Sequence, residues 1–533
     1  MLALLSTAAA AEVVRRDANA SLPSAITPLR FVAAGPSGGR HRRLSPDGIG
    51  LQGNLHTLGY FSADVCVGTP ARAFDLIVDT GSSLTALPCS DCSQCGTHAH
   101  PGGTSSQRFD ASLSSTSEEL HCSDSKCPGH RCVNSNQCAY SVSYTEGSSI
   151  RGRMMFDQFE FASATGGSTR VRASFGCQTF ESGLFRSQVA DGITGLSQST
   201  GFGGTLFDWL RQAKHTPNVF SICLGVETGA MVLGGQVPSD LNADWIPAAS
   251  YGAYSVTLDA IKIKGVAINT PSSTYRSTIV DTGTTFMYLP PQAYRAVRDH
   301  FLNHCPWGTC ASRKATGEYP DDYCYSATHA DILAFDMMAL AFSNGVSVPF
   351  GPDQYAYELR RGVWCLGIFD NEHNGAVIGG ASMRNYEVIF DRDHHRVAFV
   401  PSDCHGMHTQ TTESVLVGGY GLSGCKVPAR PPPPPHPPTA SPPPPPCPCP
   451  PPTPDPPPPP SPPPPPLPSP PSPPSRTPSR IERTALDWMG RDGTVLTRLD
   501  WTPLDWTRLD WTRLDWTRLG WTRLGWTRLD WTL

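Results

Sequence analysis

The chain has 533 residues, a length that would accommodate three ordinary domains, but its composition is uneven. Of its 54 prolines, 34 lie between Pro428 and Pro478, and eight of its 12 tryptophans lie from Trp488 onward. The formal net charge of -5, from 41 basic and 46 acidic residues, excludes the strongly basic surface typical of nucleic-acid-binding proteins. A run of about 18 apolar residues, which a membrane-spanning helix needs, does not occur, so we expect no transmembrane anchor.

The beginning of the chain resembles segments that precede a mature domain. Residues 1–11 form an apolar stretch ending in small alanines, which predicts a signal peptide. Residues 12–55 are rich in Arg, Ser, Pro and Gly and contain a basic cluster at 40–43. We predict a pro-segment or linker there.

The number of cysteines indicates in which cellular compartment the protein folds. The chain contains 18 cysteines, ten of them between Cys66 and Cys223, which favours disulfide bonds formed in an oxidising compartment. We therefore expect a protein of the secretory pathway (endoplasmic reticulum or Golgi), the extracellular space or the cell wall. The alternative, a cytosolic zinc protein, is disfavoured because the spacings lack a paired CxxC and HxxxH framework.

Residues 56–404 have the pattern of an all-β domain. Short apolar runs of four to eight residues alternate with Gly, Pro, Ser or Asp, as in FDLIVDT, VFSICL and STIVDT. Helical periodicity is clearest at 204–213 and 291–302. The sequence therefore predicts β-sheets with a few short helices beside them.

Beyond residue 404 the sequence lacks the apolar pattern of a core. Residues 405–480 comprise a linker and a Pro-rich segment whose PPPPP blocks favour an extended polyproline II rod, either an inert spacer or an anchor to a cell wall. Residues 481–533 form a tail that repeats W-T-R-L-D about every five residues, a period that lines up tryptophans on no single face of a helix or strand. We expect both segments to be disordered and assign no function to the repeat, which a translated short DNA repeat would also produce.

Two segments share one signature, an apolar β-branched run followed by Asp-Thr-Gly. The first contains Asp79 and the second contains Asp281, about 200 residues later, and each follows a predicted strand. A single Asp-Thr-Gly is an ordinary strand-ending turn, whereas two such copies are improbable by chance. Asp79 and Asp281 are therefore candidate catalytic residues.

The chemistry of paired carboxyls explains why the signature occurs twice. Ionising one carboxyl makes ionisation of the other costly, so the pair holds one proton over a broad acidic range. The carboxylate can then remove a proton from water while its protonated partner donates a hydrogen bond to the scissile carbonyl. Neighbouring glycines let backbone amides approach the carboxylates, and neighbouring hydroxyls orient them. These candidate support residues are Thr80, Gly81, Ser82, Thr282, Gly283 and Thr284.

The order of the other motifs resembles the pepsin-like aspartic proteases. GTP at 68–70 precedes the first Asp-Thr-Gly, DGITGL at 191–196 follows it, WIP at 245–247 precedes the second, and VIGG at 377–380 begins the closing stretch. The resemblance covers the whole predicted peptidase domain, 56–404. It implies two similar β lobes, at about 56–245 and 246–404, with a central substrate cleft and one aspartate from each lobe.

The resemblance also implies a β-hairpin flap over the cleft. Tyr144 and Gly147 match its Tyr-x-x-Gly-Ser pattern and are candidate substrate-binding residues. One departure is visible. Pepsins usually carry a tryptophan seven residues after the first aspartate to support the flap tyrosine, and this chain has Ala86 there.

The cysteines narrow the resemblance to the plasmepsin V and nepenthesin-like subgroup. The motif Cys89-x-x-Cys-x-x-Cys-Gly-x-His98 carries this similarity, and a metal site is its rival interpretation. The plasmepsin V resemblance implies that Glu146 and Glu181 contact an arginine three residues before the cleaved bond. The alternative for either glutamate is a role without substrate contact, such as a solvated charge.

These observations predict an aspartic endopeptidase that acts on peptide or protein substrates and processes secretory-pathway proteins after Arg-x-Leu-like motifs. We expect a monomer with no cofactor and no metal. An alternative is a secreted nepenthesin-like acid protease of broad specificity. Alternatives of another class are a wall-anchored structural protein and a non-catalytic binding module of pepsin fold, although such modules usually lose one Asp or Gly of the two motifs, which are intact here.

Overall fold

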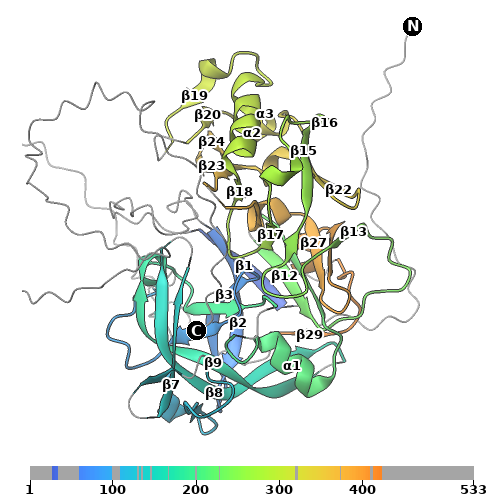
Figure 1. The fold of residues 1–533 in the computed structure, drawn as a ribbon. Helices are drawn as coiled ribbons and strands as arrows, with labels where there is room; N and C mark the ends of the chain where they lie inside the picture. The colour runs from blue at the N-terminus through green and yellow to red at the C-terminus, as the bar shows by residue number, and fades with distance from the viewer. Residues whose placement is uncertain are drawn as a thin grey trace, which may run out of the picture. The chain divides into compact units, whose positions relative to one another are not determined.

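The computed structural model describes residues 27–33, 59–98, 108–128, 131–133, 136–144, 147–165, 167–198, 201–226, 228–317, 322–372, 374–408 and 412–422. Strands dominate these residues, which contain only four α-helices (Figure 1). The prediction of an all-β fold with few short helices is confirmed. The predicted disorder of the Pro-rich segment and the repeat tail concerns residues outside the described ranges.

The largest sheet in the described part of the chain has 16 strands. In order of neighbours, its main path comprises β13 (Trp245–Pro247), β28 (Arg396–Pro401), β27 (Tyr386–Asp391), β11 (Val219–Leu224), β12 (Thr228–Leu233), β1 (Thr27–Ala33), β2 (Gly59–Val67), β3 (Arg72–Asp79), β10 (Gly192–Gly195), β4 (Thr85–Pro88), β9 (Ser168–Ser182), β8 (Ser149–Ser163), β7 (Gln137–Ser143) and β6 (Cys132–Val133). Two further strands pair with this path, β5 (Glu118–Glu119) with β8, and β29 (Tyr420–Gly421) with β8 and β12. Most of its pairings are antiparallel, as short turns between consecutive strands require.

Three smaller sheets lie in the second half of the domain. The first contains β14 (Ser255–Val256), β17 (Thr278–Asp281), β26 (Val377–Gly379), β18 (Met287–Leu289) and β25 (Ile368–Asp370). The second contains β16 (Val266–Ala267), β15 (Leu258–Ile263), β21 (Met338–Phe342) and β22 (Ser347–Phe350). The third contains β19 (Lys314–Ala315), β20 (Cys324–Ser326), β24 (Val363–Leu366) and β23 (Ala356–Arg360). Burial alternates along β21 and β22, so the second sheet presents one face to the core.

The helices are short and have recognisable ends. Helix α1 (Leu206–Lys214) begins at Thr205, whose side chain forms a capping box with Asp208. Helix α2 (Pro291–Asn303) has proline at its first position, where no intrahelical N–H is needed. Both coincide with the predicted helical segments. Two shorter helices are α3 (His329–Leu333) and α4 (Cys404–His408).

The core joins the two halves of the domain through an aromatic cluster. The rings of Phe220 and Phe390 stack with centroids 4.7 Å apart, and Tyr254 packs on Phe390 at 4.6 Å. The Tyr254 hydroxyl donates to the carbonyl of Leu196, which directly follows β10. This contact ties the start of the second half to the strand that pairs with β3.

Two described strands outside the predicted 56–404 segment belong to the largest sheet. Strand β1 lies within the segment predicted as a pro-segment or linker and pairs with β2 and β12. Beyond Cys404, the Ser414 hydroxyl and the Val415 amide donate to the buried carboxylate of Glu387, and β29 follows. Composition does not reveal such elements, because their pairing depends on strands far away in the sequence.

Seven disulfides are formed within the described residues. They join Cys89 to Cys177, Cys92 to Cys95, Cys122 to Cys132, Cys127 to Cys138, Cys223 to Cys404, Cys305 to Cys310 and Cys324 to Cys365. Several close long loops, including the 181-residue separation between Cys223 and Cys404. This pattern agrees with folding in an oxidising compartment.

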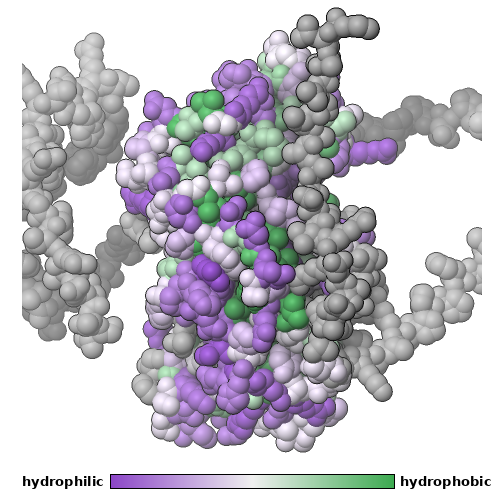
Figure 2. Space-filling view, turned by 90° about the vertical axis from the view of Figure 1, so that its right-hand side faces the viewer, coloured by the Kyte–Doolittle hydropathy of each residue, from purple (hydrophilic) through white to green (hydrophobic). Residues whose placement is uncertain are grey.

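The surface is mixed in polarity. Figure 2 shows one face on which hydrophilic residues predominate and apolar residues form separate patches. Among the described helices, none has the length and apolar character needed to cross a bilayer.

Candidate active site

The two aspartates end equivalent strands. In the first half, β3 pairs in parallel with β10, so that Asp79 lies opposite Gly195, and β10 also pairs antiparallel with β4. In the second half, β17 pairs in parallel with β26, so that Asp281 lies opposite Gly379, and β26 also pairs antiparallel with β18. The same arrangement of three strands therefore positions the carboxyl group of each aspartate.

Each carboxyl receives the same kinds of hydrogen bond. The Gly81 amide donates to Asp79 Oδ1 at 2.8 Å, and the Ser82 hydroxyl donates to Asp79 Oδ2. The second site repeats this pattern, with the Gly283 amide donating to Asp281 Oδ1 at 2.9 Å and the Thr284 hydroxyl donating to Asp281 Oδ2 at 2.7 Å. These local bonds fix the plane of each carboxyl.

The two turns are joined to each other through their threonines. The Thr80 amide donates to the Thr282 hydroxyl at 3.1 Å, and the Thr282 amide donates to the Thr80 hydroxyl at 3.0 Å. Each hydroxyl also donates to the opposite strand, Thr80 to the Val280 carbonyl and Thr282 to the Val78 carbonyl. Both threonines are almost fully buried, so these four hydrogen bonds hold the two turns in one position.

The glycines allow the carboxyls to approach. A Cβ added to Gly81 would lie 2.7 Å from the carboxyl carbon of Asp281, and a Cβ added to Gly283 would lie 2.7 Å from that of Asp79. Such distances are shorter than atoms tolerate, so each turn faces the aspartate of the other half only because it lacks a side chain there.

The two aspartate side chains are buried, and their surroundings disfavour ionisation of both. Asp79 is 5% exposed and Asp281 is 8% exposed. Burial, followed by the neighbouring charge of Asp281, raises the pKa of Asp79 well above its ordinary value, and the hydrogen bonds from Ser82 and Gly81 oppose this rise only in part. The arrangement favours a state in which the two carboxyls share a proton.

Tyr144 and Gly147 lie at the end of the hairpin formed by β7 and β8. The Tyr144 amide donates to the Ser148 carbonyl, and the Gly147 amide donates to the Tyr144 carbonyl at 3.0 Å, which closes a tight turn. Gly147 has φ of +93°, a conformation that favours glycine. Glu146 lies outside the described residues.

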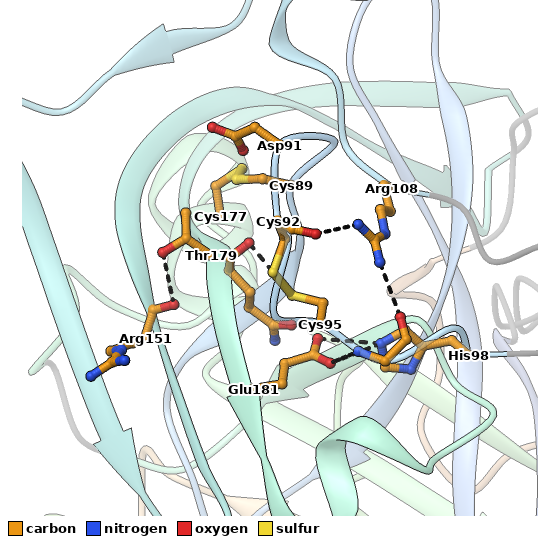
Figure 3. Close-up of a disulfide and its surroundings, with 12 residues drawn as sticks. Cys89, Asp91, Cys92, Cys95, His98, Arg108, Arg151, Cys177, Thr179 and Glu181 are labelled. Atoms are coloured by element: carbon orange, nitrogen blue, oxygen red, sulfur yellow. Dashed lines mark hydrogen bonds and ion pairs between the residues drawn. A yellow bond between two sulfur atoms is a disulfide. The ribbon is translucent and has the colours of Figure 1, made fainter.

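The structure places the Glu181 side chain in an enclosed environment. Its carboxylate pairs with His98 Nε2 at 3.1 Å and accepts the Gly96 amide at 2.8 Å (Figure 3). Both side chains of the Glu181–His98 pair are 0% exposed. The paired imidazole and the Gly96 amide explain how this carboxyl group can be buried.

The cysteines of the candidate metal motif form disulfides instead. Cys89 bonds to Cys177, and Cys92 bonds to Cys95, while the imidazole of His98 contacts Glu181 (Figure 3). The motif thus docks the 89–98 loop onto β9. The amide of Cys89 donates to the Gln178 carbonyl, and that of Glu181 to the Gln94 carbonyl.

Sequence reasoning missed the contact on the Tyr144 ring. Phe185 packs against it with ring centroids 4.9 Å apart. An isolated phenylalanine between two motifs carries no distinguishing signal, because large apolar side chains in the same region are also core residues.

The comparisons with known proteins agree with this geometry. The model of the family "Eukaryotic aspartyl protease" matches residues 60–402. Aspartic protease 5 of Toxoplasma gondii is 26% identical over 411 residues, covering 66% of this chain but only 37% of that protein. Plasmepsin V of Plasmodium falciparum is 24% identical over 444 residues (66% of this chain, 72% of that protein), and nepenthesin-2 of Nepenthes gracilis is 26% identical over 366 residues (65% and 78%).

Two equivalent β units that each present a buried aspartate on an Asp-Thr-Gly turn define the pepsin-like class of aspartic peptidases. With a family model that matches most of its length, the chain belongs to the eukaryotic aspartyl protease family.

Proposed function

We propose that the protein is an aspartic endopeptidase in which Asp79 and Asp281 activate water for peptide-bond hydrolysis. The observation that supports this most directly is the matched environment of the two carboxyls. Each accepts one amide and one hydroxyl hydrogen bond and faces the glycine of the other turn. A binding module would not need this reciprocal arrangement.

In the proposed reaction, the ionised carboxyl of the pair removes a proton from a water molecule. The water oxygen bonds to the scissile carbonyl carbon while the protonated carboxyl donates its proton to the carbonyl oxygen, which yields a tetrahedral diol. The carboxyl that took the proton from water then gives it to the amide nitrogen, and the carbon–nitrogen bond breaks as one diol hydroxyl returns its proton to the other, ionised carboxyl. The products are a carboxylic acid and an amine, and the pair again holds one proton. No covalent acyl-enzyme forms, so no nucleophilic side chain is required.

The surrounding residues have separate roles in this proposal. Gly81 and Gly283 admit the carboxyls, Ser82 and Thr284 orient them, and the buried pair of Thr80 and Thr282 holds the two turns together. We assign Tyr144 and Gly147 to a flap that covers the bound peptide. A single chain supplies both aspartates, so we propose that the enzyme acts as a monomer.

The pH dependence tests the shared proton. We expect kcat/KM to be maximal where the pair holds one proton. Because burial and the Asp281 charge raise the pKa of Asp79, the proton is retained above the ordinary carboxyl range, so activity persists there and is lost as pH rises through the raised pKa. The measurement is a pH profile of kcat/KM with the melting temperature recorded at each pH. An alkaline limb centred near pH 4, the ordinary range of an isolated carboxyl, would contradict the prediction.

For specificity, we propose cleavage after Arg-x-Leu-like motifs with Glu146 as the carboxylate that recognises the arginine. The support is its place in the sequence, directly before Gly147, and a guanidinium would form a charge-assisted pair with it. Broad specificity is the second candidate. The enclosure of Glu181 by His98 favours it, because one of the two carboxylates suggested for arginine recognition has another partner.

A peptide-library cleavage profile separates these two candidates. We expect wild-type enzyme to prefer arginine three residues before the cut, and Glu146→Gln to lose that preference by about tenfold or more, as expected for a charged hydrogen bond. Glu372→Gln, at a glutamate in a turn of the second half of the domain, is the matched control and should retain the profile. Indifference of the wild type to arginine would establish the broad-specificity alternative.

We also propose that the enzyme works in the secretory pathway or outside the cell. The seven disulfides within the described part of the chain support this, since disulfides form and persist in oxidising compartments.

A further inference from the structure

The flap tyrosine lacks the neighbour that pepsins usually provide. Position 86 carries alanine, whose side chain is fully buried in the apolar cluster on which Tyr144 packs. A methyl group offers far less contact area than an indole ring. The orientation of the Tyr144 ring must therefore depend on other residues of this cluster.

Phe185 supplies the missing aromatic contact. Its ring lies 4.9 Å from that of Tyr144, centroid to centroid, with an angle of 43° between the planes. Phe185 itself is 5% exposed, so it is packed on its other sides and presents a fixed surface to the tyrosine. It belongs to the 3-10 turn Gly183–Arg186, which directly follows β9.

This turn is bonded to the strand that leaves the flap. The Leu184 amide donates to the Ser148 hydroxyl at 2.9 Å, and the Ser149 amide donates to the Ser182 hydroxyl at 3.0 Å. A Cβ added to Gly183 would lie 2.5 Å from the Ser148 hydroxyl, so the two backbones approach as closely as glycine permits. The position of Phe185 is thereby coupled to the end of the flap.

The buried imidazole of His98 braces the same turn from its other side. His98 Nε2 contacts Glu181 at 3.1 Å, and Nδ1 lies 3.2 Å from the Gln188 carbonyl. Glu181 and Gln188 stand on either side of the 182–187 segment, so one side chain bridges both ends of the segment that carries Phe185. Glu181 also accepts a hydrogen bond from the Gly96 amide at 2.8 Å.

We propose that Phe185 is a positioning residue that sets the orientation of the flap tyrosine, and that the His98–Glu181 pair fixes Phe185 for this purpose. The proposal rests on the proposed function, because it assumes that Tyr144 closes over a bound peptide. It assigns the buried pair a role in the geometry of the flap without direct contact with substrate. The aromatic support that pepsins take from the strand after the first aspartate comes here from the turn after β9.

The test compares Phe185→Ala with Phe202→Ala. Phe202 belongs to the same part of the core and packs its ring on Tyr140, 6.4 Å between centroids, instead of on Tyr144. Both variants lose an aromatic ring, so both should melt at a lower temperature. We expect only Phe185→Ala to lose kcat/KM, by about tenfold to a hundredfold per active site titrated with a pepstatin-like inhibitor, because loss of positioning has effects of this size.

The lower kcat/KM of Phe185→Ala should come mainly from a higher KM, because the flap contacts the bound peptide. Phe185→Leu should recover part of the lost kcat/KM. Equal kcat/KM in Phe185→Ala and Phe202→Ala would overturn the proposal. If Phe185→Ala yields no folded protein, Phe185→Leu tests the proposal instead, because wild-type kinetics in that variant would also overturn the proposal. Failure of the proposed function gives a different result, namely no peptide hydrolysis by the wild type or undiminished hydrolysis by Asp79→Ala.

Discussion

Replacing Asp79 or Asp281 with alanine or asparagine is expected to lower kcat/KM for peptide hydrolysis by on the order of 10³-fold or more, since general acid–base catalysis by positioned groups contributes effects of this size. Either replacement leaves one carboxyl, which cannot serve as base for water and acid for the carbonyl at the same time. The measurement is hydrolysis of a fluorogenic peptide at the pH optimum of the wild type. Undiminished turnover in either variant would contradict the proposed mechanism.

The asparagine variants also show whether a loss of activity is due to unfolding, because we expect them to stay folded. The raised pKa means that folded Asp79 binds its proton more tightly than the unfolded chain does, so the pair lowers the free energy of unfolding as pH rises above the ordinary carboxyl range. Asparagine does not ionise, so this loss of stability does not occur in the variant. We expect Asp79→Asn to melt at or above the wild-type temperature at neutral pH. Asp259→Asn, at an exposed aspartate, is the matched control and should change neither kcat/KM nor the melting temperature.

Gly283→Ala is expected to reduce kcat/KM by on the order of 10²-fold, the effect that a displacement of about 1 Å can have on a catalytic group. The new methyl group would lie 2.7 Å from the carboxyl carbon of Asp79, well inside van der Waals contact. The preceding residue, Thr282, is held by hydrogen bonds to the Thr80 hydroxyl and the Val78 carbonyl, so we expect the strain to fall on the carboxyl. The measurement is kcat/KM together with the melting temperature.

Gly380→Ala provides the control for this substitution. Its added Cβ would lie 3.5 Å from the Leu224 side chain and 3.7 Å from the Thr282 carbonyl, which are ordinary contact distances. We expect near wild-type activity in this variant. If Gly283→Ala were equally active, the carboxyls would not be as closely apposed as the structure describes.

The aspartate pair was predictable from the sequence because its determinants are local. The amide and hydroxyl donors of each carboxyl lie two and three residues after the aspartate, so the Asp-Thr-Gly-Ser and Asp-Thr-Gly-Thr motifs contain most of the site. The strand content of the fold was equally accessible, since short apolar runs between turn residues were frequent.

The surroundings of the flap were not predictable in the same way. Glu181 meets His98 from 83 residues away, and the sequence offers no sign that a carboxylate in FGCQTFES is enclosed. Phe185 is similarly defined by a contact with Tyr144 across the fold. The pairing of β1 and β29 with the largest sheet also depends on distant partners, which composition does not reveal.

The reciprocal hydrogen bonds of Thr80 and Thr282 have a consequence for motion. They lie at the point where the two aspartate-bearing turns meet, and each of them spans 202 residues of sequence. Four hydrogen bonds at this point join the two turns directly, two between the threonines and two from their hydroxyls to the opposite strands. We therefore expect the separation of Asp79 and Asp281 to stay the same when peptides of different bulk bind.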